Sequence, residues 1–140
     1  MNWPRFALAV VVSGITVSFT DWFFFGVLFH DKYSVYPEVW RTSQAGNKPI
    51  WIALGFFSCA IFIYVCGRLN LYDYGATLKL ALWMWLALAL PIIITNALFI
   101  KLHPLVVLAH SLGWLARLMV AGISVRLIMR PALAKTGRLV

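Results

Sequence analysis

Asp21 and Arg117 are ionisable residues that stand inside long apolar stretches of the chain. No Asp, Glu, Lys or Arg lies between Lys101 and Arg117, and the next charged residue after Arg117 is Arg126. An ionised side chain in lipid hydrocarbon costs about 2.5 to 3.5 kcal/mol on insertion scales, so each of the two needs a partner. Opposite charges in contact relieve each other through a charge-assisted hydrogen bond. We therefore predict a buried ion pair between Asp21 and Arg117.

Further polar residues fall at a similar depth in the predicted helices. His110 and Arg117 are seven residues apart, which places them on one helical face, and Trp114 belongs to that face. Asn96 and His110 each lie roughly 10 Å outward of the midpoint of their helix. We expect a polar pocket around the ion pair in the outer half of the bundle, formed by Thr20, Thr95, Asn96, His110, Ser111 and Trp114.

Small residues predict where helices approach each other closely. Gly14 and Ser18 have the small-x-x-x-small spacing that lets a neighbouring helix come near, and they share a face with Asp21. Gly113 lies on the face of the other helix that carries Arg117. We expect Gly14, Ser18 and Gly113 at helix contacts.

The same residues admit structural and functional interpretations. For Asp21 and Arg117, a clamp that fixes helix register is as well supported as a role in binding or transport, because pairing alone does not distinguish them. His110 fits an interhelical hydrogen bond better than a proton relay or a metal ligand, since no second histidine stands at ligand spacing. A site of His30, His103 and His110 is the least favoured alternative. Nucleotide, zinc, P-loop and hydrolase motifs are missing, so we expect no metal, no cofactor and no catalytic residue.

The composition predicts the elements that position these residues. Of the 140 residues, 63% are hydrophobic and 11% are charged, whereas soluble domains carry roughly 25% charged residues. Because a membrane-crossing helix needs about 20 apolar residues, the whole chain is predicted to be one all-α membrane domain of four transmembrane helices. We expect the helices at about 6–29, 50–71, 77–100 and 104–129, with an interfacial loop at 31–49 and a kink at Pro91, where Ala87 loses its hydrogen bond.

The distribution of positive charge predicts the orientation and the partners. The chain carries a net charge of +8. With both ends on one side, that side holds seven basic residues and the other holds four; the first group is Arg5, Arg68, Lys79, Arg126, Arg130, Lys135 and Arg138, and the second is Lys32, Arg41, Lys48 and Lys101. We therefore expect both termini in the cytoplasm and contacts with anionic lipids of that leaflet. Nucleic acid is not an expected partner, because the basic residues form no stripe beside exposed aromatic side chains.

Two long stretches carry a resemblance to a known family. They are "DWFFFGVLFHDKY" at the end of the first helix and "PIIITNALFIKLHPLVVLAHSLGWLARLMVAGI" across the third and fourth helices. They resemble the bacterial family called domain of unknown function 1761, whose members are small polytopic membrane proteins. The resemblance implies the same architecture and the bacterial cytoplasmic membrane, and it brings no activity with it. Asp21 and Lys32 depart from the usual pattern, in which an uncharged residue and an aromatic residue are expected.

Three classes of function are consistent with these patterns. The first is a structural or small-ligand-binding membrane protein, with a small anion as the ligand where Arg117 is free to meet it. The second is a small transporter or proton-coupled permease, as a dimer because four helices rarely enclose a pathway. The third is a membrane enzyme that acts on lipid. The sequence leaves both the ligand and a homo-oligomeric state open.

Overall fold

The structure is a computed structural model that describes residues 2–40 and 48–129, without the side chain of Lys48. Most of the described residues are helical, and none of them is in a strand. Four helical stretches are long and apolar enough to cross a membrane, as predicted. They are α1 with η1 (Trp3–Asp21 and Trp22–Leu28), α3 (Lys48–Arg68), α4 with η4 and α5 (Tyr74–Met84, Trp85–Ala89 and Leu90–Phe99), and α6 with η5 (Pro104–Ser124 and Val125–Met129). Two short helices, α2 (His30–Tyr33) and η2 (Pro37–Val39), follow the first stretch in the predicted loop, of which residues 41–47 lie outside the described residues.

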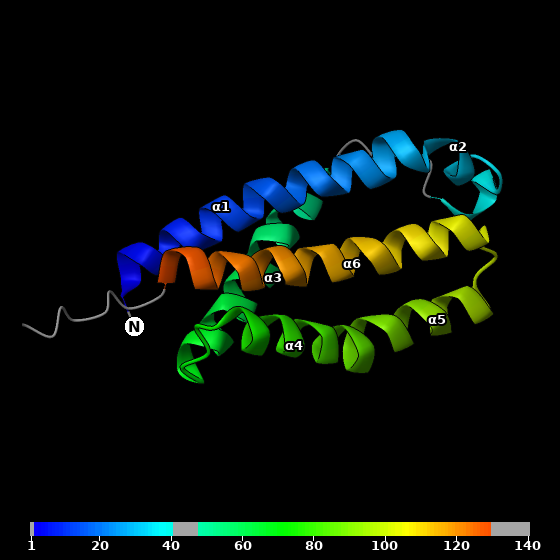
Figure 1. The fold of residues 1–140 in the computed structure, drawn as a ribbon. Coiled ribbons are helices and arrows are strands. Elements are labelled where there is room, and N and C mark those ends of the chain that lie inside the picture. Colours follow the sequence, from blue (N-terminus) through cyan, green and yellow to red (C-terminus); the bar gives the residue numbers. More distant parts are fainter. Residues whose placement is uncertain (1, 41–47, 130–140) are drawn as a thin grey trace, which may run out of the picture.

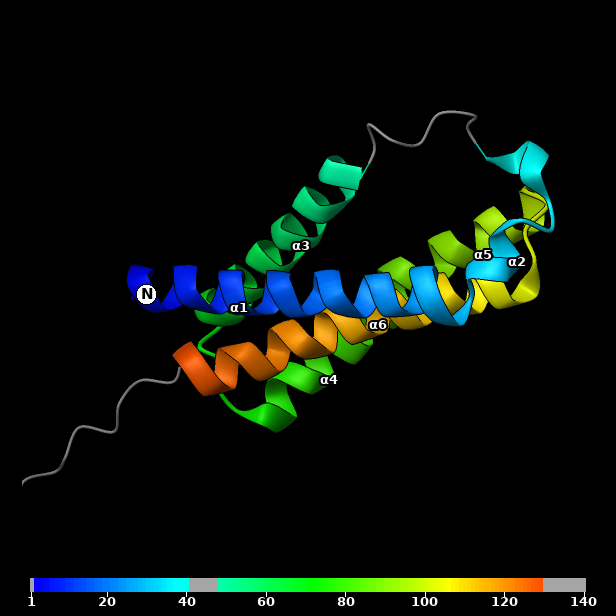
Figure 2. The ribbon, with the colours of Figure 1, turned by 90° about the horizontal axis from the view of Figure 1, so that it is seen from above.

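Three of the long helical stretches form a layer, and the fourth crosses one face of it. In Figure 1 the central α6 lies between α1 and the α4–α5 stretch, and α3 runs diagonally behind them. Figure 2 shows that α3 is close to the layer at its C-terminal end and diverges from it toward its N-terminal end. The N-terminal end of α1 and the C-terminal end of η5 lie at the same end of the layer (Figure 1). Because α3 diverges from the layer toward its N-terminal end, that end packs less closely against the other helices than its C-terminal end does.

Local sequence signals set the helix ends. Asn2 caps α1 by accepting a hydrogen bond from the backbone N–H of Arg5 at 3.2 Å, and Asp73 caps α4 in the same manner through Gly75 at 2.8 Å. The third stretch thus begins at Tyr74, earlier than the expected residue 77. The second ends at Arg68, earlier than the expected residue 71, because Asn70 adopts a left-handed conformation with φ 54°.

Pro91 is accommodated by a wider helical turn. It cannot donate a backbone hydrogen bond, and a regular α-helix would be disturbed one turn before it. The structure has the π-helical segment η4 at this place, and the N–H of Leu90 donates to the carbonyl of Trp85, five residues earlier. The disturbance predicted at Ala87 therefore takes the form of a π-helical turn, in which Ala87 lies.

The apolar core lies in the half of the molecule that contains the start of α1 and the end of η5. Its largest fully buried side chains are Phe62 and Ile63 of α3, which pack with Val17 of α1 and Leu118 of α6. These contacts hold the C-terminal half of α3 against the layer. In its N-terminal half, Ile50, Ile52 and Leu54 are exposed. Another interaction must fix this half, and the ion pair lies beside it.

Candidate functional site

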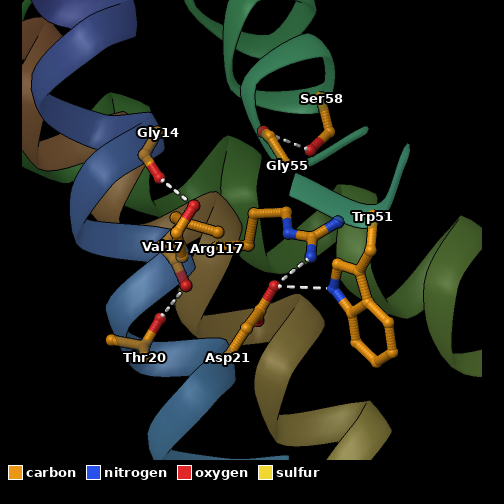
Figure 3. Close-up of polar contacts among 9 residues, drawn as sticks. Gly14, Val17, Thr20, Asp21, Trp51, Gly55, Ser58 and Arg117 are labelled. Atoms are coloured by element: carbon orange, nitrogen blue, oxygen red, sulfur yellow. Dashed lines mark hydrogen bonds and ion pairs between the residues drawn. The ribbon is translucent and has the colours of Figure 1, made fainter. Parts of the chain in front are cut away.

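Asp21 and Arg117 meet inside the molecule, as Figure 3 shows. Arg117 Nη2 donates to Asp21 Oδ2 at 2.6 Å, and the side chains are only 8% and 9% exposed. The same carboxylate oxygen accepts a second hydrogen bond, from the indole Nε1 of Trp51 at 3.1 Å. A single oxygen atom therefore joins α1, α3 and α6.

The guanidinium of Arg117 has an aromatic neighbour on its own helix. The Trp114 ring lies 4.6 Å from Arg117 Cζ, within the range of a cation–π contact. Trp114 is three residues before Arg117, so it covers the same helical face. The positive charge is thus compensated by a carboxylate and by the face of an indole ring.

One oxygen of the carboxylate and one nitrogen of the guanidinium remain without partners. Asp21 Oδ1 and Arg117 Nε are buried, and neither has a hydrogen-bond partner within the described residues. A Cβ atom at Gly113 would lie 3.7 Å from this Oδ1 and 3.2 Å from Cζ of Phe25. Glycine at position 113 therefore lets α6 approach the carboxylate and the Phe25 ring closely.

A group of aromatic rings from η1, α2, α3 and α6 adjoins the ion pair through Trp51. We call Phe25, Tyr33, Trp51 and His110 the aromatic cluster. Phe25 is at its centre, with ring centroids 4.8 Å from His110, 5.1 Å from Trp51 and 6.0 Å from Tyr33. These separations are those of rings in direct contact. The rings therefore form one packed cluster, which is linked to the ion pair by the hydrogen bond of Trp51.

Tyr33 and His110 form the polar contact of the aromatic cluster. Tyr33 Oη lies 3.3 Å from His110 Nε2. Burial, and secondarily the negative charge of Asp21, raise the pKa of the Tyr33 phenol. The hydroxyl therefore keeps its proton and can donate it to an unprotonated Nε2. His110 thus contacts α2 through a hydrogen bond of the interhelical kind expected from the sequence.

The small residues expected at helix contacts lie in α1 and α6. Gly14 is buried, and a Cβ atom there would overlap the ring of Phe56 from α3. Ser18 Oγ donates to the carbonyl of Gly14 at 2.9 Å. Thr20, expected in the polar pocket, likewise donates within its own helix, to the carbonyl of Val17 at 2.9 Å.

Three of the expected pocket residues are not part of this site. Thr95 and Asn96 are exposed on α5, and only Ile93 and Ala97 nearby are partly buried. Ser111 is buried, but it lies six residues before Arg117 and about 120° away around the helix; its carbonyl accepts the indole N–H of Trp85 at 3.0 Å. Their assignment to a pocket with Arg117 is therefore wrong, because similar depth does not imply a common direction around the helix.

Trp51, Phe25 and Tyr33 belong to the site but were not among its predicted residues. In the sequence, Trp51 and Tyr33 resemble ordinary aromatic anchors at the membrane interface, and Phe25 resembles a lipid-facing residue. The one available signal is the indole N–H of Trp51, a hydrogen-bond donor near the depth of Asp21. Sequence alone does not show which of several tryptophans turns inward.

A metal site receives no support within the described part of the chain. No group of three or more His, Cys, Asp or Glu side chains there could hold a metal ion. His103 has another role, since its Nδ1 accepts from the N–H of Leu105 at 3.2 Å and caps α6.

No protein-family model, curated protein or solved structure matches this chain.

Proposed function

We propose that this chain is an integral membrane protein of the bacterial cytoplasmic membrane, related to the family named above, with four transmembrane helices and cytoplasmic termini. Four apolar helices, with the start of α1 and the end of η5 at the same end of the molecule (Figure 1), support an even number of crossings. In the topology expected from the sequence, the side of the termini carries seven basic residues and the other side carries four, which supports the cytoplasmic placement.

Within this protein, the Asp21–Arg117 pair acts as a structural clamp. The observation that carries this proposal is that Asp21 Oδ2 accepts hydrogen bonds from Arg117 of α6 and from Trp51 of α3. Trp51 lies in the N-terminal half of α3, which diverges from the layer (Figure 2). The two hydrogen bonds therefore fix this part of α3 at a defined register and distance from α1 and α6.

The geometry favours a clamp over a site for an anionic ligand. Arg117 already donates to a carboxylate, and its guanidinium is covered by Trp114. An incoming anion would meet the negative charge of Asp21 beside the guanidinium and would have to displace it. Because Asp21 Oδ2 lies 2.6 Å from Arg117 Nη2, the arginine already has a counter-ion and is not free to bind another anion.

A double-mutant cycle on the detergent-purified protein tests the clamp. Asp21→Asn and Arg117→Gln each leave one buried charge without a partner, so each lowers the free energy of unfolding by about 3 to 5 kcal/mol. The double variant loses less than the sum of the two single losses, by roughly 1 to 3 kcal/mol. Thermal or denaturant unfolding measures all three.

The exposed ion pair between Lys101 and Glu38 is the matched control. Its Nζ and Oε1 atoms are 3.8 Å apart, and its side chains are 68% and 62% exposed. The same cycle with Lys101→Gln and Glu38→Gln should give a coupling of about 0 to 1 kcal/mol. If Asp21 and Arg117 couple no more strongly than this control pair, the clamp is excluded.

A small uncharged ligand beside the pair is the second candidate, and the unpartnered buried atoms favour it. Asp21 Oδ1 can accept a hydrogen bond and Arg117 Nε can donate one. A molecule that satisfies both must offer a donor and an acceptor, as water, an alcohol or an amide does. A high-resolution density map in a lipid nanodisc separates the cases: a feature larger than water supports a ligand, and a single water supports the clamp alone.

A further inference from the structure

Thr95 and Asn96 are polar side chains that point away from the rest of the molecule. Both are exposed, and neither side chain makes a hydrogen bond within the described residues. Thr16 of α1 is exposed as well, but its hydroxyl donates to the carbonyl of Val12 at 2.8 Å. The side chains of Thr95 and Asn96 therefore differ from this exposed hydroxyl in having no internal partner.

The depth of Asn96 makes this exposure costly. The uncharged run of this helix extends from Leu80 to Ile100, with its midpoint at Leu90. Asn96 is six residues from Leu90, about 9 Å along the axis, and the hydrocarbon core extends about 15 Å to either side of its centre. An amide at this depth has no water to bond, so it requires a partner from another protein segment.

The surroundings of Asn96 form one face of α5 that is opposite to α6. Ile92, Thr95, Asn96 and Phe99 follow each other at helical spacing, and we call them the Asn96 face. Ile92 is 62% exposed and Phe99 is 84% exposed. The Tyr74–Phe99 stretch is also the least covered of the four: 11% of its most apolar window is buried, against 28% to 44% in the others.

We propose that the Asn96 face binds a second copy of this chain, with Asn96 hydrogen-bonded to Asn96 of that copy. Two copies inserted in the same orientation are related by an axis along the membrane normal, so each residue keeps its depth and meets its own equivalent at the axis. A carboxamide both donates and accepts, so an Asn–Asn pair satisfies itself, as buried asparagines do in coiled coils. The apolar side chains of Ile92 and Phe99 then pack on either side of the pair.

A second copy fits better than an unrelated helix for a chemical reason. A different partner would need a polar side chain at the same depth and facing direction, whereas a copy of this chain supplies one by symmetry. The hydroxyl of Thr95 lies next to the pair and can join it. The proposal rests on the membrane placement proposed above, but it does not depend on the clamp, because α5 and the Asp21–Arg117 pair are on different helices.

Disulfide cross-linking in native membranes tests the contact. Ile92→Cys lies on the Asn96 face and should give covalent dimers on mild oxidation. Leu98→Cys is the matched control, because Leu98 is 76% exposed on the same helix but faces another direction. The native Cys59 and Cys66 are buried and add little background. Equal cross-linking from positions 92 and 98, or none from 92, would overturn the proposal.

Variants at position 96 test the role of the amide. By resonance energy transfer between labelled copies in vesicles, Asn96→Leu should weaken self-association by roughly 3- to 20-fold, the range measured for hydrogen bonds between membrane helices. Asn96→Gln retains the amide and should keep most of the association. If leucine associates as strongly as asparagine, the amide pair is absent and the proposal fails; if both variants associate equally weakly, packing alone is responsible and it fails too.

Discussion

The fourth and third candidate spans, Pro104–Met129 and Tyr74–Phe99, have the same length but opposite relations to the rest of the molecule. In the fourth span, 44% of an apolar 18-residue segment is buried inside the molecule, and in the third span only 11% of such a segment is buried. Arg117 of the fourth has a counter-ion inside the chain, whereas Asn96 of the third has no partner within the described residues. A polar residue in an apolar helix therefore indicates that its side chain has a polar partner. Burial of that side chain shows whether the partner belongs to the same chain.

Replacing Arg117 of the fourth span and Asn96 of the third by leucine gives the largest predicted contrast. Arg117→Leu leaves the Asp21 carboxylate buried without a counter-ion and should lower the free energy of unfolding by about 3 to 5 kcal/mol. Asn96→Leu removes no internal contact, so it should change the same quantity, measured in dilute detergent where copies are separated, by less than about 0.5 kcal/mol. Thermal unfolding of the two variants measures the difference. Comparable losses in both would show that α5 is held by internal contacts at Asn96.

Glycine substitutions sharpen the comparison at the contacts of α1 and α3. Gly14→Ala places a methyl group into the ring of Phe56, so it should destabilise the protein by about 1 to 3 kcal/mol. Gly55→Ala is the control, because its Cβ would lie at an ordinary 3.7 Å from Val17. This variant should be neutral or slightly stabilising, since alanine restricts the unfolded chain more than glycine does. If both variants lose the same free energy of unfolding, Gly14 is not the point of closest approach between α1 and α3.

The hydrogen bond of Trp51 provides a smaller effect confined to one half of a helix. Trp51→Phe removes the donor to Asp21 and should lower the free energy of unfolding by about 1 kcal/mol, because the residue is half-exposed. Hydrogen exchange should become faster in residues 50–55 and stay unchanged in residues 59–66, which pack in the core. Trp83→Phe on the third span serves as the control, since Trp83 is 61% exposed. If the exchange rates change equally along the whole of α3 in the Trp51 variant, the hydrogen bond to Asp21 is not what fixes the N-terminal half of α3.

Sequence reasoning found the four helices and proposed the pair of Asp21 and Arg117 for energetic reasons. A long uncharged run has few alternatives to a membrane helix, and two opposite charges near the middle of such runs each need the other. It misassigned Asn96 because residue spacing gives depth along the axis and not the direction of a helix relative to its neighbours. The helix ends near residues 68 and 74 depended on Asn70 and Asp73, whose local conformations outweighed the apolar pattern.

The contact between Tyr33 and His110 gives the smallest predicted effect, and its sign depends on pH. Near neutral pH, Tyr33→Phe loses one hydrogen bond of 3.3 Å and should cost about 0.5 kcal/mol. Burial and Asp21 raise the pKa of the folded phenol above its unfolded value. Below that unfolded value, about 10, the phenol is protonated in both states and contributes no pH dependence. Above it, the unfolded chain releases this proton and the folded chain keeps it, so the stability of the parent protein falls as pH rises.

Replacing Tyr33 by phenylalanine removes this alkaline loss of stability, because the variant has no phenol to titrate at that position. The difference between the two proteins should therefore shrink or reverse between about pH 9 and 11 in thermal unfolding experiments. A constant difference across that range would mean that the Tyr33 phenol titrates alike in both states. The aromatic cluster would then leave the Tyr33 phenol as accessible to water as in the unfolded chain, in contrast to Arg117, which is buried.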